Sequence, residues 1–168
     1  ARDARGTRRV PSPIEPWHGP VRGFSFVREV QPVLDRYCAS CHDGEQAQPS
    51  LRGGEMIADW ATQMAGHWPG GGKFTRSYAE LFRYLRTPGI EGDRRMLSPL
   101  DFHFSQTELG QILRKGHYGV ALDAESWDRL ATWLDLNAPF YGTWGEVPQF
   151  TEGYGPHNCE KLTKNVAR

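Results

Sequence analysis

The chain has 168 residues, and its 20 basic and 20 acidic side chains give a formal net charge of zero. That balance argues against a nucleic-acid binder, which is expected to be clearly basic. No run of apolar residues reaches the ~18 that a membrane-spanning helix needs. Hydrophobic residues make up 38% and aromatic residues 12% of the chain, which predicts a folded domain rather than a disordered one. Because the first residue is Ala1, we expect a processed form or a part of a larger protein.

The chain is predicted to begin with an extended arm, residues 1–22, because four prolines fall within it. A helix is expected in the segment 24–37, where Pro32 suits the first turn of a helix that runs to Tyr37. The segment 55–65, with sequence EMIADWATQMA, predicts another helical face because its large apolar residues are spaced by four.

Three later helices have predicted N-terminal caps. Ser77 and Ser105 are each followed three residues later by a glutamate, the pattern of a capping box. The second box leads into a helix over 106–115 that ends at a glycine, and Asp123 is expected to cap a third helix over 124–136. Sustained strand alternation is absent from the sequence, so the fold is predicted to be mainly α.

Two of the three cysteines lie in the string CASCH at residues 38–42, and Cys159 stands alone. The pattern C-x-x-C-H is typical of a c-type haem attachment site. On a helical turn Cys38 and Cys41 face the same side, so both sulfurs can bond the vinyl groups along one edge of a porphyrin. His42 follows as the proximal iron ligand. The sequence therefore predicts one haem c, held covalently through the two cysteines.

Two other chemistries use paired cysteines. A thioredoxin-like redox pair requires a βαβ context that this sequence does not show. A structural zinc site, as in an interaction module, would need a second ligand cluster at a suitable spacing, and none is apparent.

The sixth iron ligand has three main candidates, Met96, His103 and His117. Met96 precedes a predicted helix, and an ordinary core thioether is its alternative role. His103 lies among aromatic residues and could equally be a packed, hydrogen-bonded side chain. His117 follows the helix 106–115 at a turn flanked by glycines, which would let the backbone approach a flat ligand. Weaker candidates are His18, His67 and His157.

The segments LDRYCASCHDG and RKGHYGVALDAESWDRLATWLDLNAPFYGTW resemble the monohaem cytochrome c domains of large planctomycete proteins. The similarity extends over about residues 24–145 and includes the C-terminal cytochrome domain of the hydrazine synthase alpha subunit. It implies bis-histidine ligation by His42 and His117. Met96 and His103 stay open as alternative distal ligands. The other haem domain of that subunit uses a tyrosine ligand four residues past the motif histidine, where this chain has Gln46.

The expected architecture is a cytochrome c-like helical domain built around one covalently attached haem, with long loops. It comprises an extended arm (1–22), the monohaem domain (23–145) and a C-terminal tail packed on it (146–168). The connection 43–95 is long for a small cytochrome, and we expect it to cover a haem edge or to form a partner surface.

The expected function is single-electron transfer by a six-coordinate haem rather than enzyme catalysis. The alternative is a haem enzyme or gas-binding sensor with an exchangeable distal ligand. We expect a redox partner protein or domain, no nucleic acid and no membrane span; an oligomer or a larger complex stays open. Because haem c is attached outside the bacterial cytoplasm, the resemblance implies a periplasmic or extracellular location.

Overall fold

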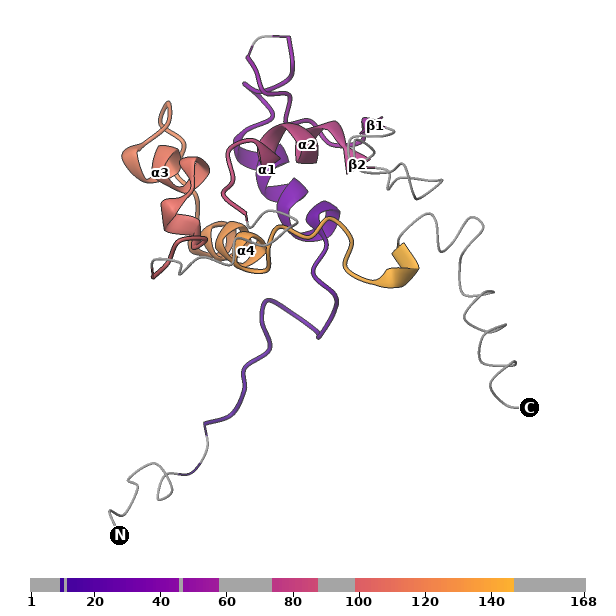
Figure 1. Ribbon diagram of the computed structural model, residues 1–168, viewed down its shortest axis with the longest axis vertical. Coiled ribbons are helices and arrows are strands. Elements are labelled where there is room, and N and C mark those ends of the chain that lie inside the picture. Colours follow the sequence, from indigo (N-terminus) through magenta and orange to yellow (C-terminus); the bar gives the residue numbers. More distant parts are fainter. Residues whose placement is uncertain (1–9, 11, 46, 58–73, 88–98, 147–168) are drawn as a thin grey trace, which may run out of the picture.

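The computed structural model describes residues 10, 12–45, 47–57, 74–87 and 99–146. Its elements, in chain order, are η2 (Phe26–Val30), α1 (Gln31–Tyr37), β1 (Met56–Ile57), β2 (Phe74–Thr75), α2 (Arg76–Phe82), η4 (Phe104–Gln106), α3 (Glu108–Lys115), α4 (Ala124–Asp135) and η5 (Trp144–Glu146) (Figure 1). The prediction of a mainly helical fold is confirmed for these residues. Within the same ranges, no helix has the length and apolar character needed to cross a bilayer.

The first helical segment begins as the π-helical turn η2 and continues as α1. The backbone N–H of Gln31 bonds to the carbonyl of Phe26, five residues earlier, and Pro32 lies in the first turn of α1. Proline is tolerated in a first turn because the N–H that it lacks would have no partner within the helix there. The predicted helix that runs to Tyr37 is confirmed. Its inner face buries Phe26, Val30, Val33 and Leu34.

Of the three predicted caps, one is confirmed and two are wrong. The side chain of Asp123 accepts the backbone N–H of Ser126 at the start of α4. In α2 the cap is Thr75, and in α3 it is Thr107. A threonine hydroxyl can accept the same backbone N–H as a serine hydroxyl, and in each case a threonine immediately precedes the first helical residue.

The two misassigned serines have other roles. Ser77 lies inside α2, fully buried, and donates to the Oε1 atom of Gln31 at 2.6 Å. Ser105 belongs to η4, where its backbone N–H and its hydroxyl both contact the Nδ1 atom of His103. A tertiary contact therefore decides what the Ser77 hydroxyl does, whereas a local contact decides what the Ser105 hydroxyl does.

The predicted helical face over 55–65 is wrong at its start. Met56 and Ile57 form the strand β1, which pairs antiparallel with β2 in the register Met56↔Thr75 and Ile57↔Phe74. The other two residues of the expected face, Trp60 and Met64, lie outside the described residues. Since β2 leads directly into α2, the pairing supports the start of that helix.

An aromatic cluster forms the centre of the core. Phe26 and Trp133 are fully buried, and Tyr78 and Phe140 are nearly so. The ring centroids of Phe26 lie 5.1 Å from Tyr78 and 5.2 Å from Trp133. The indole N–H of Trp133 donates to the carbonyl of Pro139 at 3.0 Å. Because α2 supplies Tyr78, part of the long 43–95 connection belongs to the core.

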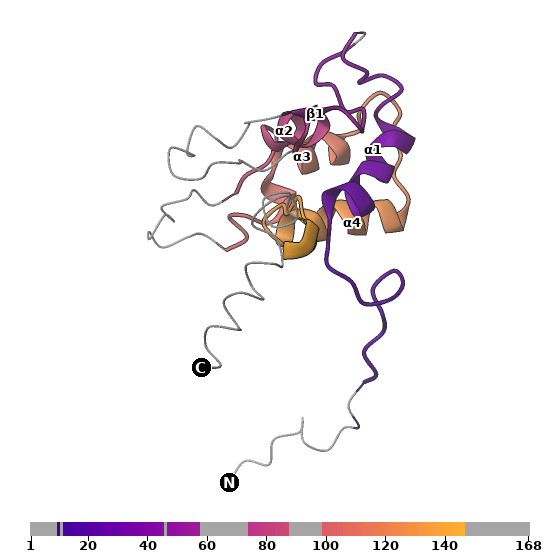
Figure 2. The same cartoon turned by 90° about the vertical axis from the view of Figure 1, so that its right-hand side faces the viewer.

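Helix α3 differs from the other helices in how little of it is buried. Gly110 is its one buried residue, and its large apolar side chains Leu109 and Leu113 are only partly buried. Figure 1 shows α3 to one side of α1 and α2, while Figure 2 shows α1 and α4 on the opposite side of the fold from α2 and α3. An amphipathic helix normally buries its apolar stripe fully, so apolar surface of α3 stays uncovered.

Among the described residues of the N-terminal arm, those near its junction with the domain hold it in place. The indole N–H of Trp17 donates to Asp128 at 2.7 Å, and Arg22 donates to Glu29 at 2.8 Å. Further out, Ile14 is 97% exposed, and the chain runs away from the helices in both views (Figures 1 and 2).

Candidate functional site

The CASCH segment forms one further helical turn after the end of α1. The backbone N–H groups of Cys41 and His42 both bond to the carbonyl of Cys38, at 3.1 and 2.9 Å. Both thiols are free, with Cys38 half-buried and Cys41 exposed. The structure therefore keeps the two cysteines three residues apart on a helical turn, as the sequence predicted, without joining them in a disulfide.

The environment of Cys38 does not favour thiol exchange. Burial, with a smaller contribution from Cys41, raises the pKa of the Cys38 thiol to about 11. Redox-active C-x-x-C pairs instead have a cysteine whose pKa is lowered to about 3.5–7.5. The Cys38 thiol is thus protonated at neutral pH and is a poor nucleophile for disulfide chemistry.

The orientation of His42 is fixed by the loop that follows it. Its Nδ1 atom lies 3.2 Å from the carbonyl oxygen of Pro49, and its own carbonyl accepts the N–H of Leu51 at 2.8 Å. Because a carbonyl can only accept a hydrogen bond, Nδ1 carries the proton and the Nε2 lone pair is free to bind a metal. A metal-ligating histidine is commonly oriented in this way, by a hydrogen bond from the ring nitrogen that does not bind the metal.

His117 is presented by a tight turn just beyond α3. The helix ends at Gly116, and the N–H of Val120 bonds to the carbonyl of His117 at 2.9 Å. The two central residues of this turn, Tyr118 and Gly119, have φ angles of 47° and 79°. Positive φ at both central positions defines a type I′ turn. The prediction of a glycine-flanked turn at His117 is confirmed, and the turn type is a finding of the structure.

The structure brings together the side chains of His42 and His117, which are 75 residues apart in the sequence. Their Nε2 atoms are 3.5 Å apart, their ring centroids are 5.8 Å apart and their ring planes differ by 20°. The distance between the ring centroids exceeds the distance between the Nε2 atoms by about the width of one ring. The two imidazoles therefore point their Nε2 atoms at each other and meet end to end. The Nε2 separation is long for a hydrogen bond, which is about 2.7–3.2 Å.

The histidine pair suits a metal held between two opposed ligands. Two metal–imidazole bonds of about 2.0–2.1 Å each would separate the Nε2 atoms by slightly more than is observed. Among the described residues, no group of three His, Cys, Asp or Glu side chains is arranged to share a metal ion. Those residues therefore offer no ligand set for a tetrahedral zinc centre, whereas the two cysteines and two histidines match what a covalently attached haem requires.

Partly buried apolar side chains near the two histidines also fit a covalently attached haem. Four such residues pack against the core while staying partly exposed: Tyr37 just before the CASCH turn, Cys38 in it, Leu113 before His117 and Leu122 after His117. Apolar surface at these four positions is available for a large flat group to cover, and covering it would be favourable at about 25 cal/mol per Å².

Two other candidate ligands, His103 and His18, have partners away from His42. His103 precedes η4 and accepts the N–H of Ser105, and its Nε2 atom is 3.9 Å from Asp135 rather than near His42. His18 contacts Asp128 at 2.7 Å. Four further residues that the sequence singled out fall outside the described residues: Gln46, His67, Met96 and His157, as does the lone Cys159.

Sequence reasoning missed the groups that hold the CASCH loop in place. The carbonyl of Pro49 orients His42, and the N–H of Ser50, in the same peptide unit, donates to Glu80 at 2.6 Å. Gln31 then donates to the carbonyl of Leu51 at 3.0 Å. Since backbone carbonyls and N–H groups occur at every residue, only the tertiary structure shows which of them act.

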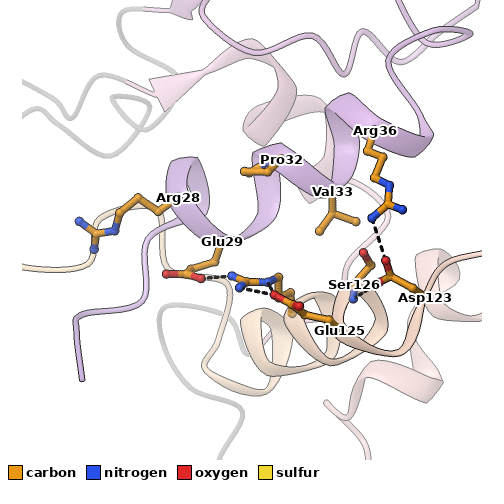
Figure 3. A pocket seen from close by; sticks show the side chains of 9 residues that line it. Arg28, Glu29, Pro32, Val33, Arg36, Asp123, Glu125 and Ser126 are labelled. Atoms are coloured by element: carbon orange, nitrogen blue, oxygen red, sulfur yellow. Dashed lines mark hydrogen bonds and ion pairs between the residues drawn. The ribbon is translucent and has the colours of Figure 1, made fainter. Parts of the chain in front are cut away.

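A separate cleft of about 290 Å³ lies between α1 and α4, away from the histidine pair (Figure 3). It is lined by Pro32 and Val33 together with several charged side chains. The arginines among them are paired with acidic side chains: Arg28 with Glu146, Arg36 with Asp123, and Arg129 with Glu29 and Glu125. With its charges satisfied internally, the cleft offers no ligand-binding chemistry comparable to that of the histidine pair.

Comparison of the chain with protein-family models, with curated proteins and with solved structures gave no match. The function therefore has to be argued from the residues and the geometry of the site.

Proposed function

We propose that this protein is a monohaem c-type cytochrome that transfers single electrons, with Cys38 and Cys41 as attachment points and His42 and His117 as axial ligands. The observation that carries the proposal is the end-to-end approach of the two imidazoles, with Nε2 atoms 3.5 Å apart, directly beside a C-x-x-C-H turn. A haem bound there would supply the one-electron iron chemistry.

The protein's own residues orient both histidine ligands. His42 is kept in the tautomer with a free Nε2 by the Pro49 carbonyl, and His117 is presented by its type I′ turn. Two histidine ligands leave no open coordination position, which favours electron transfer over binding of small molecules. Nitrogen ligation should also give a lower reduction potential than a histidine–methionine pair, since methionine raises it.

Absorption spectroscopy of protein produced with a covalent haem-attachment system tests the proposal. We expect sharp c-type bands after reduction, low-spin bands before it, and no far-red methionine-to-iron band. A far-red band would make Met96 the distal ligand. A high-spin spectrum that responds to CO or cyanide would favour the alternative of an enzyme or gas sensor. Absence of haem would refute the proposal, and a colourless zinc-containing protein would favour an interaction module.

Substitution of the two candidate distal histidines identifies the ligand. His117→Ala should convert the haem to a high-spin form that binds CO when reduced. His103→Ala is the matched control and should leave the spectrum unchanged, since His103 lies by Asp135 and Ser105. The reverse result would assign the distal ligand to His103.

The same proposal includes an extracytoplasmic location and a redox partner protein or domain. Covalent haem attachment supports the location, because it takes place outside the bacterial cytoplasm. Detection of haem-loaded protein in the periplasmic fraction of a bacterial host, and not in its cytoplasm, tests this part.

A further inference from the structure

A carboxylate on α2 is linked to the candidate ligand His42 through a single peptide group. The Nδ1–H of His42 donates to the carbonyl oxygen of Pro49 at 3.2 Å, and the N–H of Ser50 donates to the Oε2 atom of Glu80 at 2.6 Å. The Pro49 carbonyl and the Ser50 N–H belong to the same amide. The order of groups is thus imidazole, amide and carboxylate.

An amide transmits polarisation because its carbonyl and N–H share one delocalised system. An anion that accepts from the N–H increases the negative charge on the carbonyl oxygen and strengthens the hydrogen bond made there, by roughly 10–30% per bond in such chains. The contact at Ser50 is short, as expected for a hydrogen bond to a charged acceptor. Ser50 is buried, and the Glu80 side chain is only 16% exposed, so water screens the contact weakly.

We propose that Glu80 is a positioning residue for the proximal ligand, making the His42 imidazole more electron-rich through the Pro49–Ser50 peptide and thereby lowering the reduction potential of the bound haem. This inference rests on the proposed function, since it concerns the ligand of that haem. Stronger donation to a ligating histidine raises its basicity, and a more basic ligand stabilises the oxidised iron relative to the reduced iron.

Neighbouring side chains place Glu80 in this role. Arg76 is shared between two carboxylates, at 2.7 Å from Glu55 and 3.8 Å from Glu80. Its closer partner is therefore Glu55, and Glu80 directs its other oxygen at Ser50. Glu55 has no contact with the Pro49–Ser50 peptide among those found in the described residues, which makes it a matched control of equal charge.

The test compares Glu80→Gln with Glu55→Gln in the haem-loaded protein. Glutamine at position 80 retains an oxygen that can accept from Ser50 but removes the charge. We expect Glu80→Gln to raise the equilibrium constant for one-electron reduction by up to about tenfold, which is about 59 mV, and Glu55→Gln to change it much less. Glu80→Asp, which keeps the charge, should give a smaller shift than Glu80→Gln.

A spectroscopic readout separates polarisation through the peptide from a general charge effect. In the reduced, diamagnetic protein, Glu80→Gln should move the amide proton of Ser50 and the Nδ1 proton of His42 upfield, and Glu55→Gln should move neither. The effect of Glu80→Gln on the potential should also persist at high salt, where exposed charges are screened.

Equal potential shifts for the two glutamine variants, or unchanged Ser50 and His42 resonances in Glu80→Gln, would overturn this inference while leaving the proposed function intact. A wild-type chain that binds no haem would overturn both. Far-UV circular dichroism establishes that each variant is folded before its potential is compared.

Discussion

The buried carboxylate of Glu29 should be the most important single charge for the stability of the fold. It is 2% exposed. It lies on η2, and its partners come from the N-terminal arm and from α4. Arg22 donates to it at 2.8 Å, and Arg129 forms a second, very close ion pair with it. Arg129 also pairs with Glu125.

The substitution Glu29→Gln removes the charge while keeping the size of the side chain. Breaking a buried ion pair by removal of one partner costs about 3–5 kcal/mol. The side chains of Arg22 and Arg129 are 25% and 17% exposed, so both keep contact with water, and Arg129 keeps Glu125. We therefore expect the lower end of that range, about 3 kcal/mol. With a urea m-value of about 1–3 kcal/mol/M, the unfolding midpoint should fall by about 1–3 M.

The control is Glu125→Gln, which removes the other acidic partner of Arg129. The Glu125 side chain is 54% exposed, and exposed pairs contribute about 0–1 kcal/mol. Urea unfolding of the haem-loaded protein, followed by far-UV circular dichroism at pH 7, measures both variants. Equal losses, or a Glu29→Gln variant as stable as wild type, would refute the assignment of the stability to a buried pair.

Acid pH provides an independent check on the same carboxylate. Hydrogen bonding from the Arg22 guanidinium holds the pKa of Glu29 below its ordinary value, against the effect of burial. A lowered pKa in the folded state means that the charge stabilises the fold above the unfolded pKa, about 4.3. That contribution is lost as the pH falls through the folded value. Wild type and Glu29→Gln should therefore differ most near neutral pH and converge in acid.

Four further substitutions test local features of α3 and its flanking turns. Thr107→Ala should cost about 1 kcal/mol through loss of the helix cap, and Ser105→Ala should cost less; the opposite order would restore the capping box expected from the sequence. Gly110→Ala, which would stabilise an ordinary helix, should instead destabilise by several kcal/mol, because its Cβ would lie 2.3 Å from the carbonyl oxygen of Phe104. Gly119→Ala should cost about 1–2 kcal/mol from its positive φ alone, since a Cβ there meets nothing within 4 Å. Thermal unfolding of each variant measures these differences, and a stabilised Gly110→Ala would contradict the close contact.

The elements that sequence reasoning placed correctly are those with local physical causes. The run from Phe26 to Tyr37 and the helix capped by Asp123 both combine an apolar stripe with a start residue that suits a helix. Both caps that were misassigned involve a choice between two hydroxyls close together in sequence. Ser77 could not be recognised as a core hydroxyl, because its partner Gln31 is 46 residues away.

In the candidate site, too, features with local causes could be predicted from the sequence, and features that depend on tertiary contacts could not. The chemistry of residues 38–42 follows from the sequence alone, because C-x-x-C-H places its sulfurs and imidazole by local geometry. The choice of His117 over His103 depended on a resemblance, whereas the approach of His117 to His42 is a tertiary fact. The helix before His117 was expected from the sequence, but its position in the fold could not be predicted from its apolar pattern, since that pattern does not specify what covers the stripe.

The two proposed ligands differ in how firmly the protein holds them. The N–H of Leu51 donates to the carbonyl of His42, and the buried side chain of Gln31 donates to the carbonyl of Leu51. These hydrogen bonds hold the loop of His42. His117 is held by one short-range hydrogen bond from Val120 and follows the least buried helix. Local openings begin where few buried contacts resist them, so the distal ligand should detach first. In the haem-loaded protein, urea should produce a high-spin spectrum with CO binding before the far-UV signal is lost. Coincident loss of both signals would show instead that the turn of His117 unfolds only with the whole domain.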